Sequence, residues 1–313
     1  MDVRILDVFA GAGGFSLGFK GLVAAAIENH PHVVKTYLHN FPEVFLFAED
    51  VKRVSGRIVR EAVGEIDVII GGPPCEPFTS MNPRRKRDPL DRLMADPQGR
   101  LVLEFIRLVE ELRPKVYILE NVPEMIDGGL DKVLERLFAR VGYKAVFNIL
   151  EAHRYGVSSR RTRLFVSNVA LDLRGMEEAG KVVEEALRGL PPLNEAPNHR
   201  VVRTGRVRME RIRRLRWGQA LYTYRDSLGR IHRNWVRLHP RRLAPTIHGK
   251  SRFIHPYEDR LLTVREQARL MGFPDAHVFY GGVDRQFDQV GEAVPPPLAE
   301  RIARFILGIL PRL

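Results

Sequence analysis

Two short segments of the chain hold reactive side chains in restricted backbone settings. The first is GGPPCEPFTS, residues 71–80, which contains Cys75, the only cysteine among 313 residues. A lone cysteine forms no intramolecular disulfide and cannot build a zinc site by itself. The prolines before it fix the backbone, as a rigidly held nucleophile requires, whereas a cysteine that merely fills a core needs no such setting. Cys75 is therefore a candidate nucleophile.

The second segment carries a carboxylate. Glu120 closes the apolar run KVYILE and is followed by Asn-Val-Pro. A carboxylate beside a thiol, both at one edge of a sheet, favours covalent attack with help from an acid. We predict that Cys75 and Glu120 act as this pair.

A glycine-rich turn, AGAGG at residues 10–14, separates the first apolar run from a helical stretch. Such a turn directs backbone N–H groups and a helix N-terminus toward a polar or anionic group. Glu28 ends the second run, where a carboxylate can accept two ribose hydroxyls. Asp50 ends the third, where it can accept from an adenine amino group. These residues indicate a nucleoside cofactor, but NAD-, FAD- and adenosylmethionine-binding proteins all share this turn.

The elements that position these residues alternate along the first 170 residues. Continuous apolar runs separated by amphipathic helical stretches predict an α/β fold with a mostly parallel, doubly wound sheet. Ligands bind beyond the carboxyl ends of such strands, which is where all the residues above fall. The runs are VRILDVF (3–9), VAAAIE (23–28), VFLFAED (44–50), DVIIGG (67–72), KVYILEN (115–121) and RLFVSNVA (163–170).

The composition of the chain changes after about residue 170. Between residues 200 and 242 only Glu210 and Asp226 oppose a run of arginines, and both tryptophans, Trp217 and Trp235, lie there too. Arginine suits phosphate contact and bidentate reading of guanine edges. We expect the tryptophans to be core residues. The fourteen arginines are at positions 200, 203, 206, 208, 211, 213, 214, 216, 225, 230, 233, 237, 241 and 242.

Three segments follow from this change in composition. They are residues 1–170, which hold the candidate catalytic and cofactor-binding residues, the Arg-rich residues 171–242, and residues 243–313, where regular helical stretches return. The net charge of +12 and the pI near 10.1 indicate an anionic partner, with nucleic acid first. No apolar run reaches membrane-spanning length and no signal-peptide pattern opens the chain, so we expect a cytoplasmic protein with no membrane partner.

Several segments together resemble the ordered motifs of the cytosine carbon-5 DNA methyltransferases. They are DVFAGAGGFSLGF, GGPPCEPFTS, LENVPEM, RYGVSSRRTRLF, REQARLMGFPD and QVGEAVPPP, and the resemblance excludes only the variable middle of the chain. It implies a Rossmann-like class I methyltransferase fold with a small target-recognition domain. The catalytic and cofactor-binding domain would then be residues 1–170, the Arg-rich target-recognition domain residues 171–242, and residues 243–313 a C-terminal part that returns to the catalytic domain. It further implies S-adenosyl-L-methionine as cofactor, no metal, and duplex DNA bound by a monomer. A restriction-modification role, with a cognate restriction endonuclease as second partner, follows from the same resemblance.

The resemblance also assigns residues to roles. It implies that Cys75 adds to carbon 6 of a flipped-out cytosine while Glu120 hydrogen-bonds ring nitrogen 3. Arg161 and Arg163 match the arginines of the family's Q-x-R-x-R motif, which would hold the base and favour the thiolate. The residues that carry over as cofactor contacts are Phe9, Gly11, Gly13, Glu28, Asp50, Pro73 and Leu101.

Three positions depart from the family pattern. Glu76 stands where most members have Gln, Ser159 replaces the Gln of Q-x-R-x-R, and Glu292 replaces the Asn of QVGNAVPP. The added carboxylates should raise the pKa of the Cys75 thiol and oppose binding of the cofactor's carboxylate. The segment MNPRRKRDPLDRLMADPQG, residues 81–99, resembles the family's mobile lid, whose basic residues could close on phosphates.

Other functions are compatible with parts of this pattern. An RNA cytosine-5 methyltransferase of the same fold would keep every catalytic residue, and the PFT after the cysteine is also found in the family's tRNA-methylating branch. A non-catalytic DNA-binding regulator would bind cofactor and DNA without methyl transfer. The glycine-rich turn is also compatible with a nicotinamide oxidoreductase, but the PPC (73–75) and ENV (120–122) segments would have no role in hydride transfer.

Overall fold

The computed structural model describes residues 3–313. Within this range, seven strands form one large sheet and three further strands form a small one. The strands of the large sheet are β1 Ile5–Val8, β2 Val23–Ile27, β3 Phe45–Phe47, β4 Val68–Gly71, β5 Val116–Asn121, β6 Val146–Glu151 and β7 Thr162–Ser167.

The large sheet has the order β3-β2-β1-β4-β5-β7-β6. Strands β1 to β5 are parallel, whereas β7 is antiparallel to both β5 and β6. The predicted α/β fold with a mostly parallel, doubly wound sheet is confirmed. Strand β6 was not among the predicted runs because its side chains are half-buried or exposed at the sheet edge, which leaves no continuous apolar signal. Its short connection to β7 requires the antiparallel arrangement, since a parallel pair needs a long crossover.

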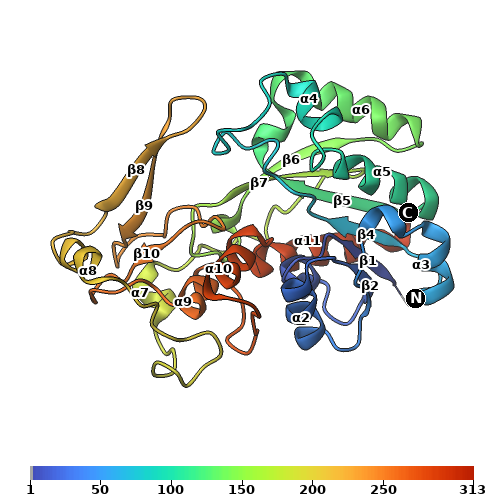
Figure 1. Ribbon diagram of the computed structural model, residues 1–313. Helices are drawn as coiled ribbons and strands as arrows, with labels where there is room; N and C mark the ends of the chain where they lie inside the picture. The colour runs from blue at the N-terminus through green and yellow to red at the C-terminus, as the bar shows by residue number, and fades with distance from the viewer. Residues whose placement is uncertain (1–2) are drawn as a thin grey trace.

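Helices cover both faces of the large sheet (Figure 1). Because side chains alternate along a strand, Ile5 and Ile70 face one helical layer while Leu6 and Ile69 face the other. The first layer contains α1, α2 and α11, and the second contains α3, α5 and α6. The helices are α1 Gly14–Gly18, α2 Pro31–Asn40, α3 Gly56–Val63, α4 Pro89–Met94, α5 Leu101–Leu112, α6 Leu130–Arg140, α7 Val183–Leu187, α8 Arg206–Arg213, α9 Val264–Leu270, α10 Val283–Glu292 and α11 Pro296–Ile309.

The small sheet has the order β10-β9-β8. Its strands are β8 Ala220–Arg225, β9 Ile231–Arg237 and β10 Phe253–Ile254, so it extends beyond residue 242. Apolar residues of α9 and α10 share a core cluster with α7 and β9. Helix α11 instead packs on α1, where a Cβ at Gly18 would lie 2.3 Å from the backbone of Ala299. The segment 243–313 is therefore shared between the small sheet and the large one.

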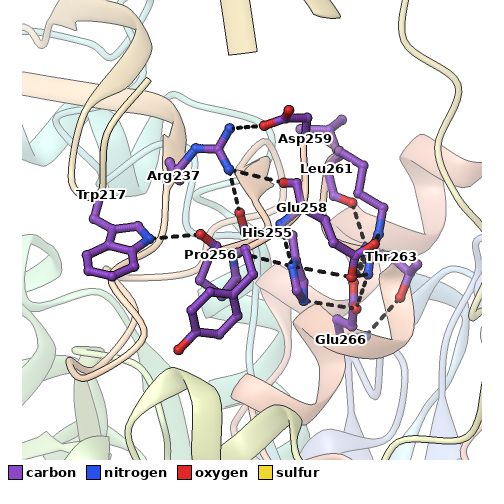
Figure 2. Close-up of polar contacts among 11 residues, drawn as sticks. Trp217, Arg237, His255, Pro256, Glu258, Asp259, Leu261, Thr263 and Glu266 are labelled. Atoms are coloured by element: carbon purple, nitrogen blue, oxygen red, sulfur yellow. Dashed lines mark hydrogen bonds and ion pairs between the residues drawn. The ribbon is translucent and has the colours of Figure 1, made fainter. Parts of the chain in front are cut away.

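A buried arginine fixes the small sheet to the segment that leads into α9 (Figure 2). Arg237 donates hydrogen bonds to the carbonyls of His255 and Glu258 and to the carboxylate of Asp259. Trp217 Nε1 donates to the carbonyl of Pro256, which lies on that same segment, over 2.8 Å. Since buried donors need partners, Arg237 is committed to this structural cluster.

Candidate active site

Strand register places three predicted motifs side by side. Val8 pairs with Gly71 and Gly71 pairs with Leu119, so β1, β4 and β5 end together at one edge of the sheet. A Cβ at Gly71 would lie 2.5 Å from the carbonyl oxygen of Val8, so only glycine permits this approach. The glycine-rich turn, the Cys75 segment and Glu120 therefore meet at the carboxyl edge, as the sequence predicts.

The turn after β1 has a backbone that few side chains tolerate. Phe9, Gly11 and Gly13 all have positive φ angles, of 61°, 57° and 80°. A Cβ at Gly13 would lie 2.1 Å from the ring of Phe41, whereas a Cβ at Gly11 would meet only the Phe9 carbonyl at 3.9 Å. The turn is thus packed tightly behind Gly13 and open in front of Gly11.

The carboxylate of Glu28 is anchored to this turn. Its Oε2 accepts the Gly11 N–H over 3.1 Å, while Oε1 accepts the N–H groups of Asn29 and His30. Asp50 lies beyond β3 and caps a short 3₁₀ helix by accepting the N–H of Lys52. Both carboxylates are half-buried and keep free lone pairs. Leu101, the first residue of α5, packs against the core cluster beneath this edge.

Backbone contacts hold the Cys75 segment in place. Asn121 Nδ2 donates to the carbonyl of Pro73 over 3.1 Å, and Asn121 is buried. The carbonyl of Cys75 accepts the N–H groups of Phe78 and Thr79, both at 3.0 Å, which forms a tight turn after the cysteine. Asn121 has no predicted role. Its polar side chain at the end of an apolar strand, next to Glu120, was the signal that could have identified it.

Glu120 forms a buried ion pair with Arg163. Nε of Arg163 lies 3.0 Å from Oε1 of Glu120, and both side chains are less than one-tenth exposed. Burial raises the pKa of Glu120 above its usual value, although Arg163 and Arg161 oppose the shift. A Cβ at Gly72 would lie 3.1 Å from Oε2, so the glycine leaves this second oxygen uncovered.

Arg161 has a different environment from the one that the resemblance implies. Its guanidinium donates to the carbonyls of Ile247, Gly291 and Ala293, and the residue is 1% exposed. Burial, together with the neighbouring Arg163, lowers the pKa of Arg161 to about 9, although Glu120 opposes the shift. The expected contact of Arg161 with the base stays a prediction, while its Nη1 and Nη2 groups connect the start of β7 to the end of α10.

The surroundings of Cys75 favour the protonated thiol. Burial and the carboxylate of Glu76 raise the pKa of Cys75 to about 12, with a smaller contribution from Glu120. Arg163 and Arg161 lower this pKa, as predicted, but their combined effect is smaller than that of burial and the two carboxylates. The expected effect of the Glu76 departure on the thiol is confirmed in direction.

Glu292 and Ser159, the other two residues that depart from the family pattern, also lie close to the catalytic edge. Burial, together with Glu76 and Asp288, raises the pKa of Glu292 to about 7. Oε1 of Glu292 would lie 2.9 Å from a Cβ at Gly249. Ser159 is buried and donates to the carbonyl of Pro245 over 2.9 Å, which ties the start of the Arg161 segment to the chain between β9 and β10.

Exposed arginines dominate the surface of the small domain. Of the fourteen arginines between residues 200 and 242, every one except Arg237 is exposed. Two of them stack on aromatic rings, since Arg208 lies 5.6 Å from the ring centre of Trp235 and Arg211 lies 5.9 Å from that of Tyr222. Trp235 packs against a small apolar cluster, as expected, but Trp217 is 50% exposed.

The described part of the chain contains neither a candidate metal site nor a candidate membrane-spanning helix. Among residues 3–313, no group of three or more His, Cys, Asp or Glu side chains could hold a metal ion. Over the same residues, no helix has both the length and the apolar character needed to cross a membrane.

Comparison with known proteins identifies the family. Residues 3–308 match the family described as C-5 cytosine-specific DNA methylase. The chain is 46% identical to a provisionally named type II methyltransferase of Methanocaldococcus jannaschii, with 97% of this chain and 99% of that protein covered. It is 32% identical to the type II methyltransferase M1.HphI of Haemophilus parahaemolyticus, covering 98% and 87%.

Solved structures agree with this assignment. A prophage-encoded chain from E. coli, provisionally named a DNA modification methyltransferase, superposes with a TM-score of 0.80 at 26% identity and 99% coverage of both chains. The Dnmt2 methyltransferase of S. pombe, at 14% identity, shares the fold with a TM-score of 0.70 over 98% of this chain and 99% of that one. The chain therefore belongs to the C-5 cytosine-specific DNA methylase family.

Proposed function

We propose that the protein methylates carbon 5 of a flipped-out cytosine in duplex DNA through a covalent bond to Cys75. In this proposal it is the methyltransferase of a type II restriction-modification system, whose partner endonuclease reads the same sequence. The observation that carries the proposal is the placement of Cys75 beside the buried Glu120–Arg163 pair, at the same sheet edge as the turn after β1.

The residues at this edge fit S-adenosylmethionine. The open space in front of Gly11 and the half-buried carboxylates of Glu28 and Asp50 suit a nucleoside with ribose hydroxyls and an adenine amino group. Phe9, Gly11, Gly13, Glu28, Asp50, Pro73 and Leu101 would hold it. When bound, this cofactor supplies a methyl group activated by a sulfonium.

The chain's own residues account for the addition step. Once its proton is lost to solvent, the Cys75 sulfur forms a bond to carbon 6 of the ring. Glu120, whose burial favours the protonated acid, donates its proton to ring nitrogen 3 as charge develops there. Arg163 fixes one carboxyl oxygen of Glu120, and the uncovered Oε2 beside Gly72 is free to face the base.

The same residues reverse the addition after methylation. Carbon 5 loses its proton to solvent, the electrons of that C–H bond re-form the double bond between carbons 5 and 6, and the bond between carbon 6 and sulfur breaks, so that the aromatic ring is restored. Glu120 then recovers its proton from nitrogen 3. Acid assistance of this kind contributes about 10²–10⁴ in rate. Arg161 acts as a positioning residue, because its three carbonyl contacts set the place of β7 and hence of Arg163.

Positive charge on both domains supports a nucleic-acid substrate. The exposed arginines of α8 and the β8–β9 hairpin lie on the small domain, while Arg84, Lys86 and Arg87 are exposed on the loop before α4. Phosphate contacts of this kind fix a duplex in position without reading its sequence.

A trapping experiment tests the function. A pool of duplex oligonucleotides containing 5-fluorocytosine is incubated with adenosylmethionine and the protein, with tRNA in parallel. Fluorine cannot leave as a proton does, so we expect a covalent protein–DNA band that survives denaturation and is absent with Cys75→Ala. Equal trapping on tRNA would favour an RNA substrate. No band on either nucleic acid would contradict the catalytic proposal.

A further inference from the structure

The turn of the β8–β9 hairpin contacts the segment that follows Cys75. Ser227 donates from both its backbone N–H and its Oγ to the carbonyl of Ser80, over 3.1 and 3.0 Å. In return, Ser80 Oγ donates to Oδ2 of Asp226 over 3.0 Å. Figure 1 shows the hairpin standing away from the rest of the small sheet, with its turn directed toward the loop before α4. These contacts join residues almost 150 positions apart in sequence.

Charged groups extend this contact to the segment that follows Glu120. Arg230 pairs with Asp226 over 2.8 Å and with Glu124 over 3.2 Å, and its guanidinium also donates to Ser80 Oγ. His232 Nε2 lies 2.9 Å from Oδ2 of Asp226. The hairpin turn therefore contacts the segments that follow both predicted catalytic residues.

The centre of this contact is buried. Ser80 is fully buried, and the Asp226 side chain has no exposed surface. Buried hydrogen bonds between charged partners are stronger than exposed ones, because water competes less for the donors and acceptors. We call the set Ser80, Glu124, Asp226, Ser227 and Arg230 the clasp.

The clasp lies at the approach to Cys75. The tight turn formed by the Cys75 carbonyl keeps Ser80 close to the cysteine. Exposed basic residues flank the clasp on both domains, with Arg84 and Lys86 on one side and Arg225 and Arg233 on the other. In the proposal below, the duplex lies between the two segments, where its phosphates contact both sets of charges. The major groove alone is about 12 Å wide, so no duplex fits between atoms that are in hydrogen-bond contact.

We propose that the clasp closes the approach to Cys75 in the DNA-free protein and that duplex DNA must open it. The proposal rests on DNA being the substrate. Opening exchanges partners: a backbone phosphate can replace the carboxylates of Glu124 and Asp226 as the acceptor for Arg230. Only the open fraction of molecules then binds DNA, so the apparent affinity equals the affinity of the open form multiplied by that fraction.

A disulfide across the clasp tests this directly. Cys75→Ser removes the native thiol, and Ser80→Cys with Ser227→Cys places two cysteines at positions whose backbones are in hydrogen-bond contact. We expect mild oxidation to form the disulfide in the DNA-free protein. We then expect the oxidised protein to bind a fluorescein-labelled duplex at least about tenfold more weakly than the same protein after reduction. Excess duplex added before the oxidant should protect the cysteines.

Controls separate this proposal from the proposed function. The variants Cys75→Ser/Ser80→Cys and Cys75→Ser/Ser227→Cys should not respond to oxidant, and adenosylmethionine binding should be equal in both redox states. Equal duplex binding before and after reduction, or no disulfide in the DNA-free protein, would contradict the clasp alone. Failure of the reduced protein to bind duplex would contradict the proposed function and the clasp with it.

A charge-matched pair of variants gives a second test without cysteines. Glu124→Gln removes one acceptor of Arg230, whereas Glu135→Gln removes an exposed carboxylate on α6 that lies outside the clasp. Both change the net charge equally. We expect Glu124→Gln to speed duplex association, followed by stopped-flow fluorescence, about threefold or more beyond Glu135→Gln. Equal rates for the two variants would overturn the proposal.

Discussion

Removing the charge of Glu76 should make the thiol of Cys75 more reactive. Burial and Glu76 raise the pKa of Cys75 to about 12, against the opposing effect of Arg163 and Arg161. Glu76→Gln keeps the size of the side chain and removes its charge. We expect the variant to lower the thiol pKa and to alkylate faster at any pH below it.

The size of the effect follows from the charge and its exposure. Two unit charges about 7 Å apart interact by roughly 2 kcal/mol at an effective dielectric constant of about 20. Glu76 is exposed, so solvent screening reduces this to about 1 kcal/mol, which is a little under one pKa unit. The thiolate fraction then rises about fivefold. Because nucleophilicity falls as the pKa falls, with a Brønsted slope of about 0.4–0.5, the net gain in rate is about two- to threefold.

The single cysteine makes the assay direct. Iodoacetamide modification followed by intact mass reports Cys75 alone, because the chain contains no other cysteine. Rates are measured between about pH 7 and pH 10, below the thiol pKa. Glu65→Gln is the matched control: Glu65 is exposed and precedes the amino end of β4, so β4 separates it from Cys75. A profile for Glu76→Gln that superimposes on the wild-type and Glu65→Gln profiles would refute the electrostatic reasoning.

Three further predictions test the buried charges. Glu120→Gln should lower methyl transfer by about 10²-fold or more while leaving adenosylmethionine binding unchanged, measured by single-turnover kinetics and calorimetry. Arg161→Lys leaves carbonyl partners of the guanidinium unsatisfied and should lower the free energy of unfolding by about 2–4 kcal/mol, measured by urea denaturation; an unchanged midpoint would contradict its positioning role. Burial raises the pKa of Asp7 to about 7, so the folded protein retains a proton that the unfolded chain releases above about pH 4. The free energy of unfolding therefore falls as the pH rises from about 4 to 7. Asp7→Asn should therefore lose less stability than wild type between about pH 4 and 8, by up to about 4 kcal/mol, and parallel stability curves for the two proteins would contradict this.

Much of the catalytic edge could be predicted from the sequence. Parallel strands place their carboxyl ends together, so residues that follow successive apolar runs must meet. The turn at Gly11, the Cys75 segment and Glu120 are therefore expected to lie together, and the strand register agrees. The effect of Glu76 on the thiol is expected from its charge, that of the motif arginines is implied by the family resemblance, and both directions are found.

The tertiary structure decided what the sequence left open. Arg161 and Arg163 are two residues apart with the same chemistry, yet one is bound to three backbone carbonyls and the other to Glu120. The net pKa of Cys75 depends on burial, which no local pattern encodes. The clasp joins Ser80 to Asp226 across almost 150 residues. Local sequence fixes which groups lie at a strand end, whereas the balance of desolvation and long-range partners is set only when distant segments pack together.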